Sequence, residues 1–126
     1  MSKINSRSKG KRGELEFSEF CREKLGIGAR RGQQYNGIDG EDVVVSVPNL
    51  HFEVKRVQAL NVPQAVKQAE RDAGVKVPIL AHRRDREPWL LTIRAEDLRR
   101  FVEIVGDYYE SERERIAALI GQAVGR

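Results

Sequence analysis

The chain has 126 residues, of which 40% are hydrophobic and 33% charged, and its formal net charge is +4 at pH 7. This length supports one domain with its own core, and the basic excess favours an anionic partner. The single Cys21 excludes an intramolecular disulfide and a cysteine-based zinc site, and no apolar run approaches the length of a membrane-spanning helix, so we expect a soluble cytoplasmic protein.

The amino end is strongly basic. Residues 1–9 are polar, with serines among the cations, and we predict a flexible arm there. A DNA-contacting arm and a merely solvated tail explain this composition equally well. The cations that precede the first acid, Glu14, are Lys3, Arg7, Lys9, Lys11 and Arg12.

An amphipathic helix is expected from Gly10 or Lys11 to about residue 25, with Gly26 as its stop. At about 100° per residue, its apolar side chains fall on one stripe. Glu14 lies on the same stripe, where the positive end of the helix dipole would favour its ionised form. An ordinary charge near a helix end is the alternative interpretation. The stripe consists of Phe17, Phe20, Cys21 and Leu25.

Residues 29–40 read as a short extended piece followed by a glycine-rich loop. Arg30 and Arg31, with backbone amides nearby, suit a phosphate. Three acids compete for one position at the end of this loop, namely Asp39, Glu41 and Asp42. We prefer Asp42 because it directly abuts the apolar strand that follows.

Two strands joined by a Pro48-Asn49 turn are predicted over residues 43–55. Because side chains alternate along a strand, Glu53 and Lys55 share one face, while Phe52 and Val54 face the core. Pairing of the two strands would bring Asp42 near Glu53. Two carboxylates that converge beside a lysine form a hard-oxygen site suited to Mg²⁺.

A second helix is expected from Asn61-Val62-Pro63 to about Ala73, where Gly74 follows. We assign its buried stripe to Val62, Val66, Ala69 and Ala73. Gln68 either orients a water or phosphate at the site or is simply solvated.

Residues 77–82 and 89–93 read as two further strands, joined by the charged segment 83–88. Arg83 and Arg84, together with His82, suit a nucleic-acid backbone, and an ordinary solvated hairpin loop is equally consistent with the segment.

The carboxyl-terminal part is predicted to form two helices. The first spans residues 95–105, carries Leu98, Phe101, Val102 and Val105 on one face, and is followed by Gly106. The second spans 108–124, and its apolar stripe either covers the domain or joins a partner chain. Its members are Ile116, Leu119, Ile120, Ala123 and Val124. We divide the chain into an arm at 1–9, a core at 10–106 and a terminal helix at 107–126.

The resulting order, helix, three strands, helix, two strands and terminal helices, predicts an α/β fold with a central mixed five-stranded sheet. In that fold Glu14, Asp42 and Glu53 would meet at one point. Asp42, Glu53 and the backbone carbonyl of Val54 would hold a divalent ion, with Glu14 binding it directly or through water. Lys55 would position the attacking water or stabilise charge on the phosphate.

Asp42 and Glu53-Val54-Lys55, with ten residues between them and followed by a helix bearing Gln68, resemble the PD-(D/E)XK nuclease pattern. The segment Lys9-Gly10-Lys11-Arg12-Gly13-Glu14 and its spacing through Arg30 resemble archaeal-type Holliday-junction resolvases and the related small nucleases of phage genomes, over residues 8–93.

This resemblance implies a restriction-endonuclease-like core, Mg²⁺ (with Mn²⁺ as a substitute) and a homodimer that cuts four-way DNA junctions in recombination and repair. It implies that Glu14, Asp42, Glu53 and Lys55 are catalytic. Leu15, Glu41 and Tyr35-Asn36 depart from the family pattern. Nucleases of linear or other branched DNA and a non-catalytic DNA-binding module are the alternatives. The DNA contacts expected are Lys9, Lys11, Arg12, Arg30, Arg31, Gln68, Arg83 and Arg84.

Overall fold

The chain forms one central sheet with helices packed against it. The computed structural model describes residues 6–32 and 40–124, with side chains from residue 10 onwards. The predicted α/β class with a mixed five-stranded sheet is confirmed. In chain order the elements are α1 (Ser6–Phe20), a π-helical turn (Cys21–Leu25), β1 (Ala29–Arg31), β2 (Val43–Val45), β3 (Leu50–Arg56), α2 (Val62–Ala73), β4 (Val77–Arg83), β5 (Leu90–Thr92), a 3₁₀ turn (Ala95–Asp97) and α3 (Leu98–Val124).

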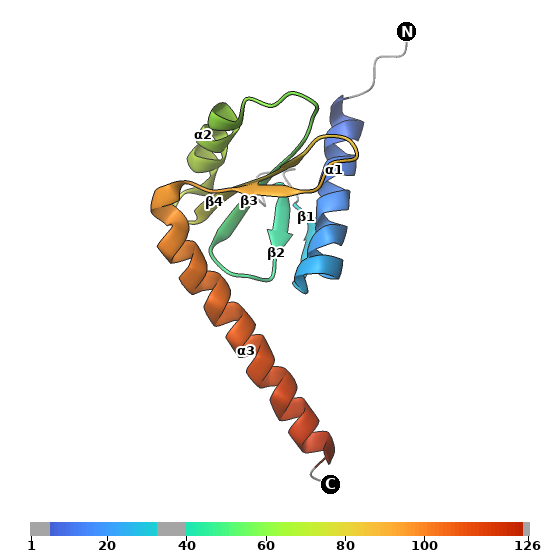
Figure 1. Cartoon of the computed structure of the whole chain (residues 1–126), viewed down its shortest axis with the longest axis vertical. Coiled ribbons are helices and arrows are strands. Elements are labelled where there is room, and N and C mark those ends of the chain that lie inside the picture. Colours follow the sequence, from blue (N-terminus) through green and yellow to red (C-terminus); the bar gives the residue numbers. More distant parts are fainter. Residues whose placement is uncertain (1–5, 33–39, 125–126) are drawn as a thin grey trace.

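The five strands follow one another across the sheet in the order β1-β2-β3-β4-β5. β3 and β4 run parallel, and the other neighbouring pairs are antiparallel. α2 is the crossover connection that a parallel pair requires. α1 and α2 lie on opposite sides of the sheet, while α3 leaves the sheet and projects away from the rest of the domain (Figure 1).

The hydrophobic core lies on the α1 side of the sheet. Phe17 of α1 packs against Phe52 of β3, with their ring centroids 5.5 Å apart. Phe52 and Val54 both belong to this core. Alternation along β3 therefore places Glu53 and Lys55 on the other face, as predicted.

Helix α1 begins earlier than predicted. It starts at Ser6 rather than at Gly10 or Lys11, so the backbone of residues 6–9, which are part of the predicted arm, is helical. The physical reason is that apolar periodicity cannot locate a helix start within a segment that has no apolar residue, while lysine and arginine are good helix formers. Residues 1–5 lie outside the described residues.

The carboxyl end of this helical segment stops where the sequence predicted. Gly26 adopts the left-handed φ of 66°, and its N–H donates to the carbonyl of Cys21. Phe17 and Cys21 are fully buried, and Phe20 and Leu25 pack against the core, so the predicted stripe is confirmed. Burial raises the pKa of the Cys21 thiol to about 12, which keeps the thiol protonated at neutral pH.

Helix α2 matches its predicted bounds. The side chain of Asn61 caps it by accepting the backbone N–H of Gln64 at 3.2 Å. Its buried stripe differs from the prediction, because Ala65 joins Ala69 and Ala73 in the fully buried set while the predicted valines are only half-buried. Three alanines allow the helix backbone to approach the sheet closely.

The carboxyl-terminal region forms one helix where two were predicted. α3 runs through Gly106 without a break, so the expected helix end at this residue is wrong. A glycine inside a helix costs about 1 kcal/mol, which contacts on the following turn offset. The hydroxyls of Tyr108 and Ser46 lie 2.7 Å apart, and Tyr109 donates to the carbonyl of Leu25.

The inward face of α3 is also shifted from the prediction. Phe101 and Val105 pack against the core together with Tyr108. Leu98 and Val102, the other predicted members, are each 56% exposed. The helix leaves the sheet at an angle, so a full apolar stripe along it does not meet the domain.

The outer half of α3 does not cover the domain, which was one of its two predicted roles. Ile116, Leu119, Ile120 and Val124 are between 49% and 77% exposed, on the part of the helix that extends beyond the sheet (Figure 1). These side chains therefore form an apolar surface directed at solvent. None of the described helices combines the length and the apolarity needed to cross a bilayer.

Candidate active site

Asp42 and Glu53 meet where β2 and β3 separate. The backbone N–H of Asp42 still pairs with the carbonyl of Phe52 at 2.9 Å. Beyond this backbone pair a side chain is the acceptor: Oδ2 of Asp42 accepts the backbone N–H of Val54 at 2.9 Å. The predicted approach of Asp42 to Glu53 is confirmed, and the two side chains interact although their residues are only 8% and 3% exposed.

The electrostatics of Glu53 reflect this crowded position. Burial raises the pKa of its carboxyl, the hydrogen bond with His51 lowers it, and the neighbouring Asp42 raises it further, with a net upward shift. Two buried carboxylates that repel one another gain from a cation placed between them. Their oxygen atoms are the donors that Mg²⁺ prefers.

Glu14 of α1 belongs to the same electrostatic cluster. Burial raises the pKa of its carboxyl, as does Asp42, while Arg31 and Lys55 act in the opposite direction. The helix dipole expected to support Glu14 does not do so, because α1 begins at Ser6 and Glu14 lies in its third turn. Its partner is instead Arg31 of β1, whose Nε donates to Oε2 of Glu14 at 2.5 Å.

Lys55 lies on the predicted face and opens toward α2. It lines a small cavity of about 290 Å³ together with Gln64, Gln68 and Arg71 of that helix. In the described part of the chain Lys55 has no ion pair with Glu53. Glu53 pairs instead with His51, while Lys55 opens to the cavity. Gln68 is thus on the site side of α2.

The donor set fits a divalent cation only in part. Within residues 10–32 and 40–124, no group of three His, Cys, Asp or Glu side chains is arranged to hold a metal ion. The side chains of Asp42 and Glu53 interact directly, and Glu14 acts on Asp42 only through its charge. This arrangement suits Mg²⁺, which usually keeps several waters and binds one or two carboxylates. The role of the Val54 carbonyl stays a prediction.

His51 and Lys76 were not recognised from the sequence as part of the site, and Glu41 was considered only as an alternative to Asp42. His51 is 1% exposed, and its Nε2 lies 3.0 Å from Oε1 of Glu53. Its Nδ1 lies 3.3 Å from Oε2 of Glu41, whose Oε1 is 3.4 Å from Nζ of Lys76. The sequence signal that could have identified His51 is the alternation of side chains along the strand, which places His51, Glu53 and Lys55 on one face.

The contacts of Glu41 bear on which of the three candidate acids is the carboxylate that partners Glu53. Glu41 faces His51 and Lys76, which favours Asp42 as the partner of Glu53. The Asp39 alternative lies outside the described residues. Gly32 helps to fix this segment, because its N–H donates to the carbonyl of Asp42 at 2.7 Å and a Cβ at residue 32 would overlap the carbonyl oxygen of Glu41.

The predicted DNA contacts fall into two groups around the site. Lys11 and Arg12 are exposed on α1, and the side chain of Lys9 lies outside the described residues. Arg30 and Arg31 are exposed on β1, and Arg31 pairs with Glu14. Lys11, Arg12 and Arg31 therefore place positive charge on the two elements that meet at Glu14.

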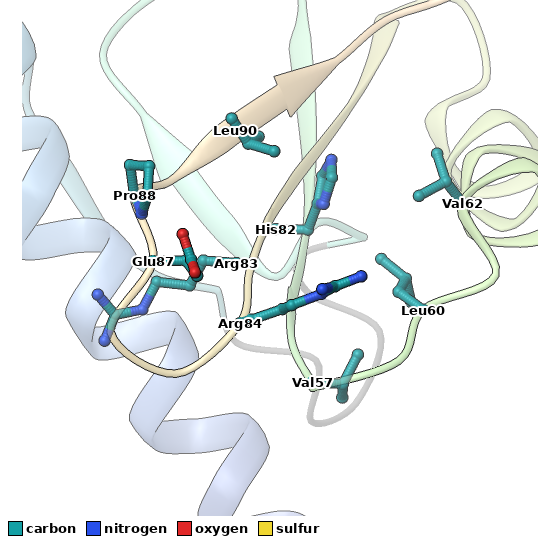
Figure 2. Close-up of a pocket in the computed structure, with 9 residues that line it drawn as sticks. All are labelled: Val57, Leu60, Val62, His82, Arg83, Arg84, Glu87, Pro88 and Leu90. Atoms are coloured by element: carbon teal, nitrogen blue, oxygen red, sulfur yellow. The ribbon is translucent and has the colours of Figure 1, made fainter.

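The second group lies on the hairpin between β4 and β5. Arg83 is engaged with Oε2 of Glu16 at 2.9 Å and lies over the Trp89 ring, whereas Arg84 is exposed and extends toward Leu60 (Figure 2). Arg84 and His82 line a cavity of about 470 Å³ that shares Leu60 with the Lys55 cavity. Burial lowers the pKa of His82, whose Nε2 lies 2.8 Å from the Thr92 hydroxyl.

No protein-family model, curated protein or solved structure matched this chain.

The raised carboxyl pKa values predict how the stability of the metal-free protein depends on pH. A carboxyl with a higher pKa in the folded state binds more protons when folded, so the free energy of unfolding falls as pH rises from the ordinary value of 4.5 through the folded value. Glu53→Gln removes one such group. We expect the unfolding free energy of the variant, minus that of wild type, to increase between pH 4.5 and pH 7.

Urea denaturation in the presence of chelator measures this difference. Glu19→Gln, on the exposed side of α1, is the matched control because it removes the same charge from solvent. Parallel stability curves for Glu53→Gln and wild type across this pH range would contradict the prediction.

Proposed function

We propose that this protein is a Mg²⁺-dependent endonuclease of the PD-(D/E)XK type that resolves four-way DNA junctions. The observation that supports this proposal best is the meeting of Asp42 and Glu53 at the point where β2 and β3 separate. Glu14 and Lys55 act electrostatically on the same point. The expected catalytic set thus comes from three different elements.

Each side chain has a role in phosphodiester hydrolysis. A bound Mg²⁺ would polarise the scissile phosphate and lower the pKa of a coordinated water. Asp42 and Glu53 supply the carboxylate oxygens for it, and Arg31 holds Glu14 in place beside them. Lys55 stabilises negative charge on the phosphate as the water oxygen bonds to phosphorus and the P–O bond to the leaving sugar oxygen breaks, with a proton passing to that oxygen.

The charge of the chain favours DNA as substrate, and the resemblance to junction resolvases favours branched structure as the feature recognised. The net charge is +4, and exposed cations lie on α1, on β1 and in the connection between β4 and β5. The described residues form one sheet with its helices. Selection by the shape of a junction needs only contacts to phosphates.

We also propose that the active form is a homodimer that associates through the outer half of α3. Resolution of a junction requires two symmetric cuts, and two-fold symmetry pairs two copies of one site. Ile116, Leu119 and Ile120 lie on one side of a helix that extends beyond the domain. An isolated helix of this kind gains most of its stability by packing such a stripe.

The dimer predicts a specific response to charge on α3. We expect the double substitution Ile116→Asp and Ile120→Asp to give a monomer in sedimentation velocity and to convert paired cuts into single nicks, because it places carboxylates in an apolar interface. Ala118→Asp, exposed on the opposite side of the helix, is the control and should remain dimeric. A dimer that survives the double substitution would place the interface elsewhere.

The decisive test is a cleavage assay with a labelled four-way junction and a linear duplex of the same sequence, each with Mg²⁺ and with chelator. We expect paired, metal-dependent cuts in the junction alone, lost in Glu53→Gln. Equal cutting of both substrates would indicate a nuclease of linear or other branched DNA. Metal-independent binding without cutting would indicate a non-catalytic DNA-binding module.

A further inference from the structure

His51 occupies an unusual position for a buried histidine. It lies in the middle of the sheet, on the same face of β3 as Glu53 and Lys55, and is 1% exposed. Both ring nitrogens face carboxylate oxygens, Nε2 toward Glu53 at 3.0 Å and Nδ1 toward Glu41 at 3.3 Å. Since an ionised carboxylate has no hydrogen to give, the ring nitrogen is the donor toward Glu53.

The imidazole ring of His51 is itself held in place by Glu41 and Lys76. Glu41, 8% exposed, lies between His51 and Lys76, whose Nζ is 3.4 Å from the other carboxylate oxygen. Lys76 is half-buried, so the row of polar groups runs from the molecular surface to Glu53. Buried polar groups are costly unless each has a partner, and this row supplies a partner at every step.

The consequence for Glu53 is geometric. A glutamate side chain rotates about three bonds, and in this position one carboxylate oxygen, Oε1, is fixed by His51. The second oxygen is then left for the neighbouring Asp42 and for whatever lies between the two carboxylates. A leucine at residue 51 would fill the same space but would leave Glu53 free to rotate.

We propose that His51 is a positioning residue that orients Glu53 for metal binding, with Glu41 and Lys76 holding the imidazole ring in place. This inference rests on the proposed metal site at Asp42 and Glu53. Residues of this kind, which bond to a ligand and not to the metal, typically change metal affinity by about 10- to 100-fold when replaced.

The two nitrogen positions of histidine can be tested separately. Gln places an amide nitrogen near the position of Nε2 and keeps a donor toward Glu53, whereas Asn places it near Nδ1 and keeps only the contact with Glu41. Mn²⁺ affinity is measured without DNA, from the loss of the free-ion signal in electron paramagnetic resonance. We expect His51→Gln to bind within about threefold of wild type, and both His51→Asn and His51→Leu to bind at least about tenfold more weakly.

Three controls separate positioning from general loss of structure. The free energy of unfolding is measured in chelator for every variant, so that only folded proteins are compared. His82→Gln changes the other histidine, which bonds to Thr92 and not to a carboxylate, and should leave Mn²⁺ affinity unchanged. If the apolar variant does not fold, Glu41→Gln replaces it, with an expected loss of about tenfold.

The possible outcomes distinguish this inference from the proposed function. Equal Mn²⁺ affinity in folded wild type, His51→Asn and Glu41→Gln would overturn the positioning role and leave the metal site intact. A wild-type protein that binds no Mn²⁺ would overturn the metal site, and the positioning role with it. Weak binding by His51→Asn, with binding restored in His51→Gln, supports both.

Discussion

Asp42→Asn is expected to lower the rate of junction cleavage by about a thousandfold while leaving the fold intact. The reason is that Asp42 has two separable functions. Its Oδ2 accepts the backbone N–H of Val54, which an asparagine oxygen can do equally well. We propose that its negative charge beside Glu53 binds a cation, which the neutral amide of asparagine would bind far less well. Single-turnover cleavage in Mg²⁺ and thermal unfolding in chelator measure the two functions independently.

Asp42→Ala is the companion variant because it removes both functions. It leaves the buried N–H of Val54 without an acceptor, which costs about 1–3 kcal/mol of stability. We therefore expect both variants to be inactive and only the alanine variant to be destabilised. Junction binding in chelator should stay within about threefold of wild type for Asp42→Asn. Near-normal turnover by Asp42→Asn would assign the first carboxylate ligand to Glu41 or Asp39 instead.

Local chemistry explains which parts of the fold were predictable. Asn61, Pro63 and Gly74 mark the ends of α2 by capping and backbone preference, and these ends match the structure. The alternation of side chains along β3 likewise predicted correctly which of its residues face the core. Gly106 failed as a helix stop because a propensity of about 1 kcal/mol is smaller than the packing of the turns on either side.

The candidate site was predictable to a similar extent. Asp42 and Glu53 were correctly paired because adjacent strands joined by a short turn leave little choice of partner. The partner of Glu14 is 17 positions away on β1, and that of His51 includes Glu41 across the strand pair. Such contacts depend on how elements pack, which periodicity within one element does not specify.

The burial of Glu53 shows why its neighbours matter to the chemistry. A carboxylate that is 3% exposed is poorly solvated, and two groups act on it, namely Asp42 and His51, with the proposed cation as a third. Removing any one of them changes the charge balance of the other two. Substitutions in this cluster should therefore be non-additive, as residues that act as a unit usually are.

Lys55→Ala is expected to lower the rate of junction cleavage by about a hundredfold at saturating Mg²⁺, with Mn²⁺ affinity changed by less than about threefold. Lys55 shares its face of β3 with Glu53 but lines the cavity toward α2, which we propose as the approach of the substrate phosphate. In that arrangement its charge would act on the phosphate more than on the metal ligands. Lys55→Arg should not restore the rate, because a planar guanidinium does not replace a compact ammonium.

Lys67→Ala on α2 is the matched control for Lys55→Ala, because Lys67 is exposed and outside the cavity lining. It should cleave at the wild-type rate. A Lys55→Ala variant whose rate recovers fully in excess Mg²⁺ would show that Lys55 acts through metal binding, contrary to this prediction. A second readout is the Glu14 carboxyl: Lys55 lowers its pKa, so the substitution should shift that pKa upward in carbon-13 NMR titration of the metal-free protein. A loss of rate together with this shift would place Lys55 between Glu14 and the substrate phosphate.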